Sequence, residues 1–173
     1  ARNGAGGSGV PAGRGQRGGR PWEAGILGTG GPAIENAARE LAADLPERVR
    51  ALIRFDGTLA RRIYAGADMM LIPSRYEPCG LTQMIAMRYG CVPVARAVGG
   101  LRDTITDFDG EAGTGFLYDA ESPEALAAAL RRALDVFEDK KAWRGQQKRG
   151  MATDFGWAAS AEQYLKRYQQ LLA

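Results

Sequence analysis

One stretch of ten residues gathers side chains and backbone features that could take part in chemistry. It covers residues 74–83, Ser-Arg-Tyr-Glu-Pro-Cys-Gly-Leu-Thr-Gln. An apolar run typical of a short buried strand, residues 67–73, precedes it, and a run typical of an amphipathic helix, residues 84–89, follows it. Ligands of open α/β sheets bind at loops that follow the carboxyl ends of strands, and the start of a helix favours anions. This loop is therefore the best candidate for a functional site.

The composition excludes several kinds of chemistry. The chain of 173 residues has no histidine and only two cysteines. It therefore holds no Ser-His-Asp or Cys-His catalytic arrangement, no imidazole proton shuttle and no structural zinc site. Two cysteines are also too few for a disulfide scaffold, so a reducing intracellular compartment is the default. Chemistry in this chain must rely on carboxylates, backbone amides and cations, and we expect no metal site.

Length and charge indicate a single globular domain. Hydrophobic residues make up 45% and charged residues 25% of the chain, both typical of globular proteins. No apolar run is long enough to cross a bilayer and nothing resembles a secretory signal, so we expect no membrane partner. The net charge of +3 comes from residues 1–25, which hold four arginines and one acid, while the rest is neutral. This balance gives no case for a nucleic-acid partner.

Residues 1–25 are rich in Ala, Gly, Arg and Pro and lack hydrophobic periodicity. Such a segment buries too little apolar surface to offset its ordering entropy, so we predict that it is disordered. Its single Arg17-Gly18-Gly19-Arg20 resembles one unit of an RGG-type nucleic-acid tail. A second interpretation is that the segment is not authentic, because out-of-frame translation of a GC-rich gene yields these residue types. An in-frame transcript across this junction would contradict that interpretation.

From residue 26 onward, strand-like and helix-like segments alternate. The predicted strands are a segment ending at residues 26–27, and residues 49–55, 67–73, 92–95 and 116–118. The predicted helices are residues 32–44, 58–65, 84–89, 123–137 and 158–172, with a polar segment around Trp143. Ser122 is expected to cap the helix that begins at Pro123. The alternation predicts an α/β fold with a doubly wound parallel sheet. We expect the leading half of that sheet to lie outside this sequence.

Two features of these elements have consequences for the site. The turn Gly28-Thr29-Gly30-Gly31 is either a phosphate cradle or a tight strand-to-helix turn, since it lacks the full dinucleotide fingerprint and the Lys-Ser/Thr of a P-loop. In the helix after the central loop, apolar residues recur at three- and four-residue steps and are expected to form its buried face. They are Leu81, Met84, Ile85 and Tyr89.

The central loop also carries a family resemblance. The motif Glu77-Pro78-Cys79-Gly80-Leu81-Thr82-Gln83 resembles the C-terminal catalytic domain of starch synthases and bacterial glycogen synthases. So do Arg88-Tyr89-Gly90, Gly99-Gly100-Leu101 and Asp154-Phe155-Gly156-Trp157. The resemblance covers roughly residues 26–173. It implies a Rossmann-like domain, the C-terminal half of a GT-B glycosyltransferase, that binds a nucleotide sugar.

The activity implied by this resemblance is the transfer of glucose with retention of configuration. The donor would be ADP-glucose, or less often UDP-glucose, and the acceptor the non-reducing end of an α-1,4-glucan in starch or glycogen. No metal ion and no further cofactor are implied.

The resemblance assigns roles to single residues of the loop. The donor diphosphate would lie against the backbone amides of Cys79, Gly80, Leu81 and Thr82, whose fixed dipoles stabilise the charge of the leaving group. Glu77 would contact the glucosyl hydroxyls and favour an oxocarbenium-like transition state. Each role has a structural alternative: Glu77 is otherwise a solvated loop acid, and Thr82 is otherwise only an N-cap. Cys79 is expected to be an inert packing thiol that serves the site through its backbone.

Residues outside the loop receive roles by the same resemblance. Phe55 would stack against the adenine ring, or else belong to the core. Gly99 and Gly100 would line the sugar site, or else form a turn. Tyr64, Tyr76 and Tyr89 are expected to be core or rim aromatics.

This sequence departs from the family in two respects. The ribose-binding glutamate found in many GT-B enzymes, eight residues after the first, is Ile85 here, as is common in starch and glycogen synthases. The Arg and Lys that neutralise the donor phosphates, and the whole N-terminal domain, have no counterpart in this sequence. We therefore expect a fragment that is inactive alone.

Two other classes of function stay open. One is a different GT-B enzyme, such as a sucrose-type or lipid-directed glycosyltransferase. The other is a non-catalytic module that binds glucan or a synthase partner. The sequence of residues 83–90 is most similar to plant and algal soluble starch synthases. This favours the plastid, with the bacterial cytoplasm as the alternative.

Overall fold

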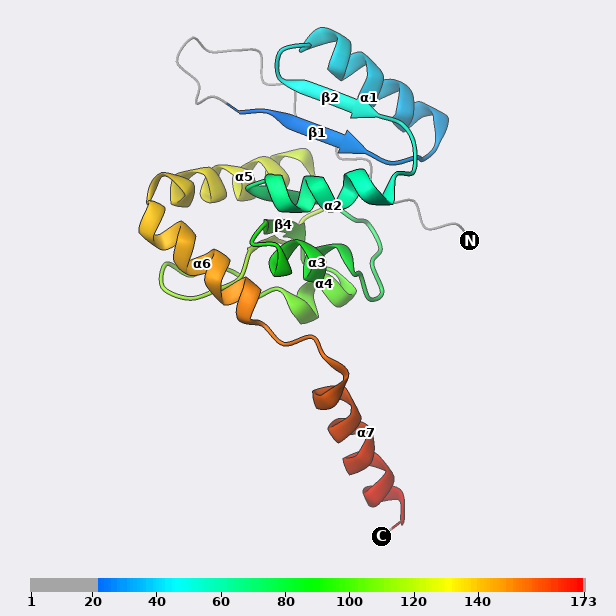
Figure 1. Cartoon of the computed structure of the whole chain (residues 1–173), viewed down its shortest axis with the longest axis vertical. Coiled ribbons are helices and arrows are strands. Elements are labelled where there is room, and N and C mark those ends of the chain that lie inside the picture. The colour runs from blue at the N-terminus through cyan, green and yellow to red at the C-terminus, as the bar shows by residue number, and fades with distance from the viewer. Residues whose placement is uncertain (1–21, 173) are drawn as a thin grey trace.

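A computed structural model of the chain describes residues 22–172. Strands and helices alternate through most of it, as predicted (Figure 1). The strands are β1 (Ala24–Leu27), β2 (Val49–Leu52), β3 (Met69–Ile72), β4 (Val92–Arg96) and β5 (Phe116–Tyr118). The helices are α1 (Pro32–Asp44), α2 (Gly57–Gly66), α3 (Thr82–Arg88), α4 (Gly99–Thr104), α5 (Pro123–Glu138), α6 (Lys140–Ala152) and α7 (Trp157–Leu172). The disorder predicted for the leader falls mainly on residues outside the described part, while Ala24 and Gly25 belong to β1.

The five strands form two parallel sheets. β1 pairs with β2, and β3, β4 and β5 form a second sheet with β4 in the middle. The β1–β2 pair and α1 lie at one end of the molecule, and α7 projects from the other (Figure 1). The predicted α/β class with parallel strands is confirmed, although the described strands are divided between two sheets.

The hydrophobic core lies on both faces of the three-stranded sheet. Successive residues of a strand point to opposite faces, and β4 contributes to both. Val92 and Val94 join a cluster on the side of α5 and α6, whose other members are Phe116, Ala129, Ala133 and Trp143. Ala95 joins the opposite cluster with Ile72, Met87, Leu101 and Ile105. Helices α3 and α4 are therefore packed on one face, and the loop before α3 is held against a rigid support.

The polar segment around Trp143 is a helix, α6, so the sequence prediction was wrong here. Asp139 caps its start by accepting hydrogen bonds from the first free backbone N–H groups. The buried side of α6 is formed by Trp143, Gln146 and Gly150. Only one of these is a large apolar residue, so hydrophobic periodicity gives no signal.

The buried face of α3 also differs from the prediction. Gln83, Ala86 and Met87 are buried, whereas the predicted core residue Leu81 is 68% exposed and Ile85 is 39% exposed. A polar residue occupies the buried face because its amide nitrogen finds acceptors there. The hydrophobic pattern therefore identified the opposite side of the helix.

Candidate functional site

The loop between β3 and α3 lies at the carboxyl end of β3, where the sequence placed the site. Its carboxylate, Glu77, is half-buried. The buried Ser74 donates a hydrogen bond from Oγ to Glu77 Oε2 at 3.3 Å. This bond links one carboxylate oxygen to a buried side chain, and the sugar-contacting role of Glu77 stays a prediction.

The backbone after Glu77 turns its amide groups outward. Gly80 has φ +69°, a left-handed conformation that side chains rarely adopt. Among the described residues, the N–H groups of Cys79, Gly80 and Leu81 donate to no acceptor. Three adjacent backbone donors without an acceptor, next to one carboxylate, are the kind of arrangement through which successive backbone amides can bind an anion.

Two predicted details of this loop are wrong. Cys79 is exposed rather than packed in the core, because its carbonyl, and not its side chain, points inward toward Gln83. Thr82 is not an N-cap: α3 begins at Thr82 itself, Leu81 takes the cap position, and no side chain caps the helix. Thr82 is exposed at the first helical position, beside the free amides.

Gly99 and Gly100 begin α4 and press against the same loop. The N–H of Gly100 donates to the carbonyl oxygen of Glu77 at 3.0 Å. A Cβ at Gly100 would lie 1.7 Å from the carbonyl oxygen of Cys79, and one at Gly99 would lie 2.1 Å from that of Glu77. These glycines permit close backbone contact between α4 and the loop, and their place in a sugar site stays a prediction.

Phe55 and the glycine turn lie near β1 and β2, away from the loop in the sequence. Phe55 is 91% exposed, which excludes the core alternative, and base stacking stays a prediction. Beside it, Asp56 caps α2, and the N–H of Leu59 lowers the pKa of its carboxyl. In the glycine turn, the N–H of Gly30 donates to Glu35 of the following helix at 2.9 Å, which favours a tight turn over a phosphate cradle.

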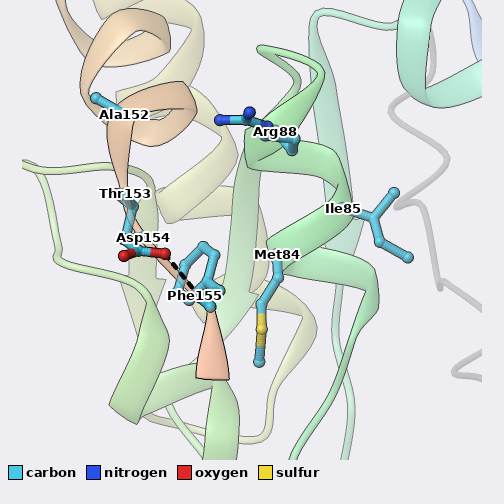
Figure 2. A pocket seen from close by; sticks show the side chains of 8 residues that line it. Met84, Ile85, Arg88, Ala152, Thr153, Asp154 and Phe155 are labelled. Carbon is cyan, nitrogen blue, oxygen red and sulfur yellow. Dashed lines mark hydrogen bonds between the residues drawn. The ribbon is translucent and has the colours of Figure 1, made fainter. Parts of the chain in front are cut away.

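A groove of about 450 Å³ lies beside α3, between that helix and the segment that leads to α7 (Figure 2). Its lining residues are Met84, Ile85, Arg88, Ala152, Thr153, Asp154, Phe155 and Gly156. Arg88 donates to the carbonyl oxygen of Met151 at 2.9 Å. Because Arg88 and Asp154-Phe155-Gly156 line the same groove, two motifs that carried the family resemblance meet here. None of the predicted donor-binding residues lines this groove, and the candidate site is the exposed loop.

Side chains that reasoning from the sequence missed hold the loop from behind. Gln83 and Ser74 are buried polar residues, and Thr104 of α4 bonds to Gln83. No periodic pattern reveals them, since their partners lie up to 21 positions away in the sequence. Within residues 22–172 no group of three or more His, Cys, Asp or Glu side chains could hold a metal ion. No helix in the same range is long and apolar enough to span a bilayer.

The fold and the loop are those of a glycosyltransferase domain, and comparison with known proteins identifies the family. The family described as glycosyl transferases group 1 matches residues 14–136. The chain therefore belongs to this family.

Relatives and solved structures agree with this assignment. The glycogen synthase of Anaeromyxobacter dehalogenans strain 2CP-C is 56% identical over 147 residues, which is 84% of this chain and 31% of that protein. The catalytic domain of starch synthase IV from Arabidopsis thaliana, solved with ADP and acarbose, is 36% identical with a TM-score of 0.74, covering 83% of this chain and 31% of that one. Sucrose-phosphate synthase from Thermosynechococcus elongatus is 31% identical with a TM-score of 0.61, and the match covers 86% of this chain and 38% of that one.

These comparisons confirm the resemblance to starch and glycogen synthases and the GT-B fold. The chain spans about a third of the length of the curated relatives it matches.

Proposed function

We propose that this chain is the donor-binding part of a glucosyltransferase that elongates an α-1,4-glucan. The proposed donor is ADP-glucose, with UDP-glucose as the alternative, and the proposed transfer retains configuration and uses no metal ion. Family membership supports the reaction class, and the similarity to glycogen synthases supports a glucan product. The observation that carries the proposal is the row of free N–H groups at residues 79–81 beside the held carboxylate of Glu77.

Within the proposed site, different groups of the loop would bind the diphosphate and the sugar. The diphosphate would accept hydrogen bonds from the amides of Cys79, Gly80 and Leu81, and from the hydroxyl of Thr82. As the bond between glucose and diphosphate breaks, negative charge grows on the leaving group, and fixed dipoles stabilise it without reorganising. Glu77 would accept hydrogen bonds from glucosyl hydroxyls and stabilise the positive charge that develops on the sugar ring.

Two rival functions are less well supported. A sucrose-type transferase has a structural neighbour in sucrose-phosphate synthase, yet identity to the glycogen synthase is higher, 56% against 31%. A non-catalytic glucan-binding module does not need free amides beside a held acid. The glycogen synthases of Anaeromyxobacter dehalogenans and Kosmotoga olearia are bacterial, which favours the bacterial cytoplasm over the plastid as the proposed location.

Isothermal titration calorimetry of the whole chain with ADP-glucose, UDP-glucose and ADP tests the proposal. Hydrogen bonds to charged groups are each worth roughly 1.5–3 kcal/mol, so the loss of one weakens binding by about 10- to 100-fold. Thr82→Val should weaken ADP and ADP-glucose alike, because its hydroxyl faces the phosphates. Glu77→Gln should weaken ADP-glucose but not ADP, because Glu77 faces the sugar.

Glu124→Gln is the matched control, since Glu124 is exposed in the first turn of α5, outside the loop. It should bind both nucleotides as the unaltered chain does. No measurable binding of any of the three nucleotides by the unaltered chain would contradict the proposed function. Glucan binding that survives both loop substitutions, without nucleotide binding, would favour the non-catalytic module.

A further inference from the structure

Gln83 lies directly behind the candidate loop and is completely buried, with 0% of its surface exposed. Its amide nitrogen Nε2 lies 3.2 Å from the carbonyl oxygen of Cys79 and 3.1 Å from that of Gly80. It also lies 3.0 Å from Oγ1 of Thr104 in α4. The nitrogen carries two hydrogens for these three acceptors, so at least one N–H is shared between two of them. One side chain therefore contacts two successive carbonyls of the loop and a second helix.

The contacts of Gln83 continue into a closed network. The Thr104 hydroxyl donates to the carbonyl oxygen of Gly100, so its oxygen is free to accept a hydrogen bond from Gln83. The N–H of Gly100 in turn donates to the carbonyl oxygen of Glu77 at 3.0 Å. The loop is thus tied to α4 at its beginning, through Glu77, and to Gln83 at its turn.

Peptide geometry connects these inward contacts with the outward amides. In a planar trans peptide the C=O and N–H groups point in opposite directions. The carbonyl of Cys79 shares its peptide plane with the N–H of Gly80, and the carbonyl of Gly80 shares its plane with the N–H of Leu81. A donor that holds both carbonyls inward therefore turns both N–H groups outward.

We propose that Gln83 is a positioning residue that sets the direction of the Gly80 and Leu81 amides, with Thr104 as the third acceptor of its amide nitrogen. Gln83 does not reach the ligand surface itself. Its effect on a nucleotide sugar rests on the function proposed above, whereas its effect on the loop does not.

A second buried glutamine provides a control that distinguishes this positioning role from the general effect of losing a buried amide. Gln146 of α6 is also 0% exposed, and it donates one hydrogen bond, to the carbonyl oxygen of Gly115 at 3.2 Å. In both glutamines Oε1 has no partner among the described residues. Replacing Gln146 removes a comparable buried amide, but Gln146 contacts no carbonyl of the candidate loop.

The test combines four variants of the whole chain. Gln83→Met keeps the length of the side chain and removes its donors. Thr104→Val removes the hydroxyl at nearly constant volume, and Thr104→Ser retains it. Gln146→Met is the control for loss of a buried amide. The readouts are ¹⁵N order parameters of Gly80 and Leu81, and the affinity for ADP-glucose.

We expect Gln83→Met to lower both order parameters from about 0.85 to below about 0.6. It should weaken ADP-glucose binding by about tenfold, the equivalent of one or two net hydrogen bonds. Thr104→Val should change both in the same direction and to a smaller extent. Thr104→Ser and Gln146→Met should stay within about twofold of the unaltered affinity and keep the loop ordered.

Unchanged order parameters in Gln83→Met would overturn the proposal, as would equal loosening of the loop by Gln146→Met. If Gln83→Met does not fold, the two Thr104 variants test the proposal instead: order parameters and affinity that are unchanged in Thr104→Val, or lowered equally in Thr104→Ser, would overturn it. If the unaltered chain binds no nucleotide sugar but the loop still loosens in Gln83→Met, the proposed function fails and the positioning role stands. If it binds ADP-glucose and Gln83→Met binds equally well, the positioning role fails and the function stands.

Discussion

The two cysteine thiols differ in their exposure to solvent. Cys79 is exposed on the candidate loop. Cys91 is 1% exposed, and burial, together with the negative charge of Asp68, raises the pKa of its thiol to about 12. Because the thiolate is the reactive form, only the first cysteine should react at moderate pH.

Iodoacetamide at pH 8 should label Cys79 and spare Cys91 in the folded chain. Mass spectrometry should find one modified cysteine under native conditions and two in urea, and Cys79→Ser should leave none under native conditions. ADP-glucose should slow the labelling of Cys79, since the proposed donor covers the loop. Labelling of Cys91 at a comparable rate in the folded chain would contradict the burial of its thiol.

The raised pKa of Cys91 also predicts how stability depends on pH. The folded thiol keeps its proton up to about pH 12, whereas the unfolded thiol loses it near its ordinary pKa of 9.0. Between these values the folded state binds more protons, so the free energy of unfolding falls as pH rises, by up to about 1.4 kcal/mol per pH unit. Below pH 9 both states are protonated and this contribution is constant.

Urea unfolding at pH 8, 9 and 10 measures this slope. Burial also raises the pKa of Tyr118, so this residue too lowers the free energy of unfolding as the pH rises. The contribution of Cys91 is therefore isolated by comparison with Cys91→Ala. The variant should show a shallower decline than the unaltered chain. Equal slopes in both chains would refute the assignment to Cys91.

At the scale of elements, the contact between α4 and the loop should tolerate almost no added volume. Gly100→Ala places a methyl group 1.7 Å from the carbonyl oxygen of Cys79, so α4 and the loop must separate. Forced overpacking of this kind costs at least about 2 kcal/mol. Gly57→Ala at the start of α2 is the matched control, because a Cβ there meets no atom within 4 Å.

Urea unfolding of the two variants should therefore give opposite results. Gly57→Ala should leave stability unchanged or raise it by up to about 1 kcal/mol, through the unfolded state. A Gly100→Ala chain as stable as the unaltered one would show that the loop and α4 are not in close contact.

The sequence predicted those elements that carry their own local signals. The helix that begins at Pro123 has Ser122 as its cap, and Ser122 Oγ accepts a hydrogen bond from the N–H of Ala125 at 3.2 Å, as expected. Helix α6 also has a capping residue, Asp139, but a glutamine and a glycine share its buried face with Trp143, so no hydrophobic period marks it as a helix.

The position of the site was predictable because it too carries a local signal, whereas the residues that hold the loop in place were not predictable. The loop follows an apolar strand and carries a specific motif. Gln83 lies within that motif, yet its role depends on Thr104 in another helix. Contacts between distant elements are fixed by tertiary packing, which a local pattern does not record.

At the scale of the whole molecule, burial is unevenly distributed. The core clusters lie around β3, β4 and β5, whereas α1 and α2 contain no buried residue. Helix α7 projects with exposed aromatic and aliphatic side chains. The candidate loop likewise presents its amides and side chains on an open surface.

An open surface suits binding better than transfer. A glucosyl group activated on an exposed loop meets water as readily as an acceptor, and electrostatic stabilisation is weak where water is not excluded. The relatives are about three times as long as the matched segment, so in them further chain is available to cover the donor. We therefore expect this chain alone to bind a donor but to transfer no glucose.

Replacing the matching segment of the Anaeromyxobacter dehalogenans glycogen synthase with the corresponding residues of this chain tests that expectation. At 56% identity most contacts with the rest of that protein should be preserved, and the chimera should incorporate labelled glucose from ADP-glucose into glycogen. Its Glu77→Gln counterpart should lose at least about two orders of magnitude of activity, because a charge stabilised in the transition state is lost. Glucose incorporation by this chain alone, above the level of its own Glu77→Gln variant, would show that the loop suffices for catalysis without a covering domain.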